Sequence, residues 1–76
     1  MNLTLDQLNP DKKAVVTGFV GEGSVMQRLM QLGVLEGSEI EIIRTAPGGD
    51  PIEIRVMGYN LSLRKAEAQM ILVEEI

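Results

Sequence analysis

The sequence has 76 residues with no cysteine and no histidine, and 7 basic against 11 acidic side chains give it a net charge of −4. This charge opposes the phosphate neutralisation that nucleic-acid affinity depends on, and one Phe and one Tyr cannot form a base-stacking platform, so we expect no nucleic-acid partner. The chain shows neither a signal-peptide pattern nor an 18-residue apolar run. We therefore expect a cytoplasmic protein, with one domain over residues 1–76, that does not insert into a membrane.

The first expected elements are a helical turn and a strand. Residues 4–8 can form one turn in which Gln7 reaches back to the amide of Thr4. Residues 14–20 are rich in β-branched side chains and run into a glycine-rich segment, which is typical of a strand followed by a loop. Gly18 interrupts this strand and predicts a bulge or a bend.

Residues 24–32 carry an apolar stripe at helical spacing. At 100° per residue the stripe consists of Val25, Met26, Leu29, Met30 and Leu32. We expect Ser24 to cap the helix start in a capping box with Gln27, and Gly33 to end the helix in a left-handed conformation. A helix this short is not stable alone in water, so its stripe must pack on the rest of the chain.

The second half of the sequence predicts strands. Residues 39–42 and 52–56 alternate polar with apolar side chains, and the loop 46–51 between them contains two prolines. The expected register places three pairs opposite each other: Thr45 and Pro51, Ile42 and Ile54, Glu41 and Arg55. This register puts the apolar side chains of both strands on one face.

The last elements follow a predicted type II′ turn with Gly58 at its first central position. A short strand over residues 61–63, one helical turn over 64–68 and a strand over 70–73 complete the chain. We expect the final strand to pair with the first. About five short antiparallel strands and one short α-helix give a mainly β fold, and an SH3-like barrel fits this pattern best.

Three blocks of sequence resemble one family. Residues 28–40 are similar to a signature of Arg-Leu, then Leu/Met-Gly, then Pro-Gly-Thr, and residues 46–52 to a Pro-x-Gly-Asp-Pro-Ile loop. Residues 61–71 are similar to a Leu-Arg-x-x-Glu-Ala-x-x-Ile block. This is the pattern of FeoA, the small cytosolic partner of the ferrous iron transporter FeoB. The resemblance implies an SH3-like barrel, no catalysis of its own, and a supporting role in Fe(II) uptake through the cytosolic GTPase portion of FeoB.

Metal binding and catalysis find little support in the residues. Iron sites in proteins favour imidazole with carboxylate, and this sequence has no His and no Cys, which leaves only carboxylates. We interpret Glu39, Glu41 and Glu53, which alternate outward along strands, as solvated strand faces. No nucleophile with a neighbouring histidine and no phosphate-binding glycine motif is found. We therefore expect a protein that is not an enzyme and has no catalytic residue, metal site or cofactor.

The candidate partner-binding residues lie on the helix, in the loop after it, and in a later basic step. They are Met26, Arg28, Met30, Leu35, Glu36, Arg64 and Lys65. Arg28 either reaches a partner carboxylate or phosphate or forms a local ion pair, and Leu35 either plugs the barrel or is an exposed anchor. The loop at residues 47–51 is a second candidate surface.

Two functions remain open at this stage. The main hypothesis is an interaction module that binds the cytosolic part of a FeoB-type transporter. The alternative is a regulatory or oligomerising module similar to the C-terminal domain of iron-dependent repressors, which binds a Pro-rich segment or associates weakly with itself.

Overall fold

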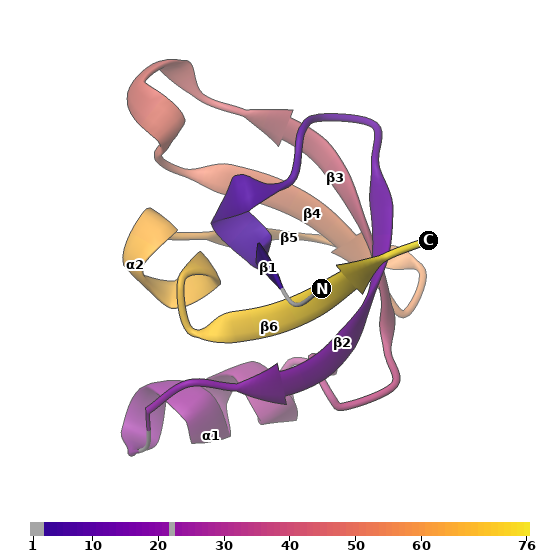
Figure 1. The fold of residues 1–76 in the computed structure, drawn as a ribbon. Helices are drawn as coiled ribbons and strands as arrows, with labels where there is room; N and C mark the ends of the chain where they lie inside the picture. Colours follow the sequence, from indigo (N-terminus) through magenta and orange to yellow (C-terminus); the bar gives the residue numbers. More distant parts are fainter. Residues whose placement is uncertain (1–2, 22) are drawn as a thin grey trace.

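The computed structural model describes residues 3–21 and 23–76. Within these residues, six strands form one antiparallel sheet in the order β1-β6-β2-β3-β4-β5 (Figure 1). The strands are β1 (Leu3–Thr4), β2 (Lys13–Phe19), β3 (Glu39–Thr45), β4 (Ile52–Val56), β5 (Tyr59–Leu63) and β6 (Ile71–Glu75). The helices are α1 (Ser24–Gln31) and α2 (Lys65–Ala68), with 3-10 turns η1 (Leu5–Gln7) and η2 (Pro47–Gly49). The mainly β class with antiparallel strands is confirmed.

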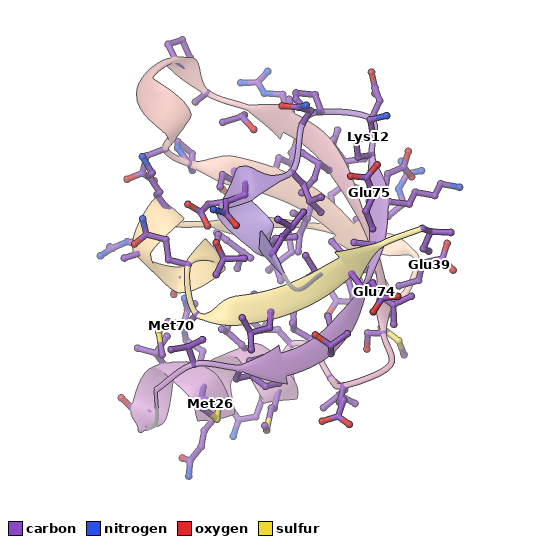
Figure 2. All side chains as sticks on the ribbon, in the orientation of Figure 1. Lys12, Met26, Glu39, Met70, Glu74 and Glu75 are labelled. Atoms are coloured by element: carbon purple, nitrogen blue, oxygen red, sulfur yellow. The ribbon has the colours of Figure 1, made fainter. Side chains whose placement is uncertain are left out.

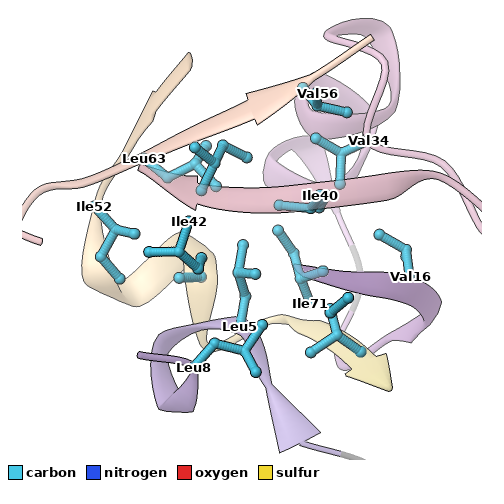
Figure 3. Close-up of a cluster of buried hydrophobic side chains, with 14 of the residues drawn as sticks. Leu5, Leu8, Val16, Val34, Ile40, Ile42, Ile52, Val56, Leu63 and Ile71 are labelled. Carbon is cyan, nitrogen blue, oxygen red and sulfur yellow. The ribbon is translucent and has the colours of Figure 1, made fainter. Parts of the chain in front are cut away.

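The core lies inside the curled sheet and is aliphatic (Figure 3). β3 and β4 alternate as the sequence predicts, so that Ile40, Ile42, Ile54 and Val56 are buried between polar neighbours. The helix α1 contributes one fully buried side chain, Leu29. It therefore closes the barrel with one deep contact and leaves much of its surface in water.

The pairing of the strands agrees with most of the expected register. Ile42 lies opposite Ile54 and Glu41 opposite Arg55, as predicted. The predicted Thr45–Pro51 pair is wrong, because the register shifts after Ile42 and Thr45 lies opposite Ile52. An extra residue in β3 takes up this shift.

The first and last long strands pair as expected. β6 lies beside β2, and their register shifts between Val16 and Gly18, so the bulge predicted from Gly18 is present. The short strand β1, which the sequence analysis missed, pairs with β6 through Leu3 and Val73. Two residues with an alternating pattern are too short to be recognised as a strand without their neighbour.

The turns at residues 4–8 and 64–68 form as predicted. In η1 the amide of Thr4 donates to Gln7 Oε1 at 3.0 Å, and at α2 the amide of Arg64 donates to Glu67 Oε1 at 2.8 Å. The expected capping box of α1 is wrong. The residue before the helix is Gly23, with φ 110° and no side-chain cap, so Ser24 is already the first helical residue.

The predicted type II′ turn is also wrong. Val56 pairs with Tyr59, so the two central residues are Met57 and Gly58, with φ values of 54° and 82°. Positive φ at both positions defines a type I′ turn, whose twist matches that of the flanking strands. β5 consequently begins at Tyr59, two residues before the expected strand.

No helix among the described residues has both the length and the apolar character needed to cross a membrane.

Candidate functional site

Large apolar side chains are exposed together where α1 ends. Among the described residues, six large hydrophobic side chains are exposed, and four of them belong to this region. The four, which we call the exit surface, are Met30 (40% exposed), Leu35 (47%), Met57 (70%) and Tyr59 (42%). Clustered exposed apolar residues are typical of a binding surface, whereas single ones need no explanation.

Two contacts join the β4–β5 turn to the end of α1. The hydroxyl of Tyr59 donates a hydrogen bond to the carbonyl of Leu32. A Cβ placed on Gly33 would lie 3.0 Å from Met57 Cγ, so the methionine side chain rests on this glycine. Gly33 has φ 94° and ends the helix as predicted. The lack of a side chain at Gly33 is what lets the turn and the helix approach each other.

The loop after α1 has a defined shape that presents Leu35. Ser38 Oγ accepts from the amide of Leu35 and donates to the carbonyl of Gly33, each at 3.1 Å. The amide of Gly37 donates to the carbonyl of Val16 at 2.8 Å, which ties the loop to β2. Because its backbone is held in this way, the loop presents Leu35 outward from a fixed position.

Met57 occupies an unfavourable backbone position for its residue type. A φ of 54° places it in the left-handed region, which costs a residue with a Cβ roughly 1–2 kcal/mol. The first position of a type I′ turn is normally Asn, Asp or Gly. Met57 therefore combines a disfavoured backbone with an exposed apolar side chain.

A shallow hollow borders Met57 on the outer face of the sheet. Its volume is about 270 Å³, and Met57 and four charged side chains line it: Lys13, Glu39, Glu41 and Arg55. Arg55 Nη1 lies 4.0 Å from Glu41 Oε1, while Glu39 has no ion pair among the described residues. The same part of the chain contains no group of three or more His, Cys, Asp or Glu residues placed to hold a metal ion.

The residues predicted from the sequence fall into separate places. Leu35 and Glu36 are exposed in the loop after α1, and Met30 is exposed on the helix itself. Met26 is half-buried near the start of α1 (Figure 2). Arg64 and Lys65 are exposed at the start of α2, which lies away from the exit surface (Figure 1).

Arg28 forms the local ion pair that the sequence left as one of two options. Its guanidinium contacts the carboxylate of Glu67 on α2, with side chains 52% and 11% exposed. Arg28 thus ties α1 to α2 while half of its side chain remains in water. The exposed half of the Arg28 side chain lies on the outer surface of α1.

Sequence reasoning missed Met57 and Tyr59. The signal was present, because a Met-Gly pair between two strands lacks the usual Asn-Gly or Asp-Gly chemistry of a two-residue turn. Assigning the turn as type II′ moved Met57 out of the central positions and hid this conflict.

Comparison with known proteins gives concordant results. A family model described as the FeoA domain matches residues 3–75. A Fe(2+) transport protein A/Fe(2+) transporter FeoB fusion protein of Porphyromonas gingivalis is 35% identical over 74 residues, which are 97% of this chain and 9% of that protein. The chain thus spans less than a tenth of the length of this curated relative.

Two solved structures resemble the whole chain. A FeoA-like protein of Clostridium acetobutylicum is 44% identical, with a TM-score of 0.91 over 99% of this chain and 87% of that one. FeoA of Stenotrophomonas maltophilia, solved with zinc and described as a procaryotic SH3 domain protein, is 29% identical, with a TM-score of 0.83 over 95% of this chain and 89% of that one. The predicted SH3-like fold is confirmed by this similarity.

Proposed function

The chain belongs to the FeoA family of non-catalytic accessory proteins of ferrous iron transport, and we propose that it acts by docking on the cytosolic, GTPase-containing part of a FeoB-type transporter. It would work in the cytoplasm beside the transporter. In this role it contributes a binding surface and no reacting group.

The observation that carries the proposal is the fused relative. In the Porphyromonas gingivalis protein, a domain 35% identical to this chain is part of the same polypeptide as the FeoB transporter. Covalent linkage holds two domains at a high effective concentration, which favours a contact between them. The contact itself must be made by a surface of the FeoA domain.

We place the docking contact at the exit surface. Methionine and aromatic side chains are enriched in the centres of protein interfaces, and polar residues surround them. Met30 and Leu35 supply the apolar centre on the helix side, while Arg28 and Glu36 lie at its polar border. Met26 lies on the same helix nearer its start and would extend the docking surface in that direction. Arg64 and Lys65 lie outside this surface.

The test is calorimetric titration of the full chain into the purified cytosolic part of FeoB. We expect saturable binding of the wild type and at least about tenfold weaker binding of the double variant Met30→Ala, Leu35→Ala, with an unchanged circular dichroism spectrum. The matched control is Val20→Ala, which shortens a 50% exposed side chain on another part of the surface and should bind normally. Absence of wild-type binding contradicts the proposal, and unaltered binding of the double variant contradicts the surface.

Two further measurements refine the role. If saturating protein leaves the GTP turnover of FeoB unchanged, its function is docking without stimulation. Sedimentation of the pure chain addresses the alternative expected from the sequence, since a closed oligomer whose assembly depends on Leu35 would favour self-association over docking.

A further inference from the structure

We propose that Met57 is the anchor of the docking surface, held at the tip of the β4–β5 turn for binding, where it enters an apolar site on FeoB that is bordered by basic side chains. This inference rests on the function proposed above and adds the anchoring residue and the chemistry of the partner's site.

Met57 conflicts with the backbone geometry of its position in the turn. Both central residues of the turn have positive φ, a geometry that Asn and Gly adopt readily and a methionine does not. A residue kept against the local backbone preference needs a compensating gain. Within the folded chain this gain is small, because the side chain is 70% exposed. Folding therefore does not account for a methionine here, whereas binding does.

The fold positions Met57 for contact with a partner. Its side chain rests on Gly33, where a Cβ would be only 3.0 Å from Met57 Cγ. Tyr59, two residues later, fixes the hairpin to the carbonyl of Leu32. A flexible, polarizable side chain on a fixed base suits an anchor that fits into a partner's apolar site. Met30 on α1 and Leu35 in the loop after it are exposed as well.

Carboxylates without ion pairs indicate a basic border on the partner's site. Glu36 in the loop after α1 and Glu39 in the hollow have no ion pair among residues 3–21 and 23–76. The nearby arginines are already engaged, Arg28 with Glu67 and Arg55 beside Glu41. Figure 2 shows Glu39 on the side of the molecule that holds the β4–β5 turn.

The hollow itself is lined by two cations, Lys13 and Arg55, and by two carboxylates, Glu39 and Glu41. Lys13 lines the hollow and lies opposite Glu41 in the strand register. The hollow beside Met57 is thus balanced in charge, while Glu36 adds a carboxylate without an ion pair among the described residues, and the chain as a whole has a net charge of −4. A partner segment with apolar and basic residues is complementary to this surface, whereas a second copy of the chain would bring like charges together.

The experiment uses Met57→Asn and Met57→Gly in the full chain, titrated against the cytosolic part of FeoB. Both residues suit the type I′ turn, so we expect the thermal midpoint to rise by about 3 °C or more while affinity falls at least about tenfold. The control Val20→Asn removes another exposed apolar side chain and should leave the affinity unchanged. If Met57 had a structural role, both variants would instead lower the thermal midpoint.

The outcomes separate the two proposals. If the wild type does not bind, the proposed function fails and this inference fails with it. If the wild type binds and both Met57 variants bind equally well, only this inference is overturned. Variants that lose stability also overturn it, because Met57 would then be retained for folding.

The charge component has its own test. Glu36→Gln and Glu39→Gln should each weaken binding by about threefold at low ionic strength, and the effect should fade as salt is added. Glu53→Gln changes the net charge equally at a site outside the hollow and should have no effect. An equal effect of all three variants would overturn the assignment of a basic border. A dimer of the pure protein that Met57→Asn dissociates would make a second copy the partner instead.

Discussion

The two connections that flank β4 differ in how well their sequences match their backbones. The loop between β3 and β4 has two glycines at its left-handed positions, Gly48 and Gly49. It ends with Asp50, whose carboxylate accepts a hydrogen bond from the amide of Lys65 at 3.2 Å. The turn between β4 and β5 instead places Met57 at a left-handed position and in water. The two connections lie at opposite ends of the molecule (Figure 1).

This difference teaches where to look for function in a small barrel. In the loop at residues 46–51 the glycines occupy left-handed positions and Asp50 accepts a hydrogen bond, so folding explains these residues. In the turn at residues 57–58 the local rule is broken and the fold gains little in return. Natural sequences are locally consistent except at functional or strained sites, so the second connection is the better candidate.

The strongest way to break this comparison is to loosen the helix that supports the exit surface. Leu29→Ala removes the fully buried side chain of α1 and should lower the free energy of unfolding by about 3 kcal/mol, measured by urea denaturation. Amide exchange should rise more in α1 than in the loop at residues 46–51, since Leu29 anchors only the former. An equal rise in both would mean that the two ends share one cooperative unit.

Much of the fold could be predicted from the sequence because its signals are local. The alternation of polar and apolar residues predicted which side chains of β3 and β4 share a face, and Gly18 predicted the bulge in β2. The errors arose where pairing with a neighbouring strand determines the structure. The register shift at Thr45, the short strand β1 and the extension of β5 to Tyr59 all depend on pairing that no single segment encodes.

The candidate site was predicted only in part for the same reason. Leu35 and Glu36 follow a helix and are close in sequence, so a local pattern could find them. Met57 and Tyr59 join them through contacts across more than 20 residues of chain, such as the hydrogen bond from Tyr59 to Leu32. The pairing of Arg28 with Glu67 is equally non-local.

The second prediction concerns Glu67, which links α2 to α1 through its ion pair with Arg28. Its side chain is 11% exposed, pairs with Arg28 and accepts from the amide of Arg64. Glu67→Ala removes both contacts and should cost about 2 kcal/mol of unfolding free energy. Glu67→Gln keeps an acceptor for the Arg64 amide and should cost about half as much. Chemical denaturation measures both, and equal losses would show that the acceptor for the Arg64 amide contributes nothing and that the charge accounts for the whole effect.

The third prediction is the smallest in stability and sharpens the comparison most. Asp50→Ala removes the acceptor for the Lys65 amide and should lower the free energy of unfolding by about 1 kcal/mol, because that amide at the start of α2 loses its partner. Affinity for the cytosolic part of FeoB should stay within about twofold of the wild type, since the exit surface lies at the other end. Leu35→Ala should show the reverse, with weaker docking and little change in stability. If Asp50→Ala weakened docking tenfold, α2 with Arg64 and Lys65 would belong to the docking surface, and the two connections would no longer differ in function.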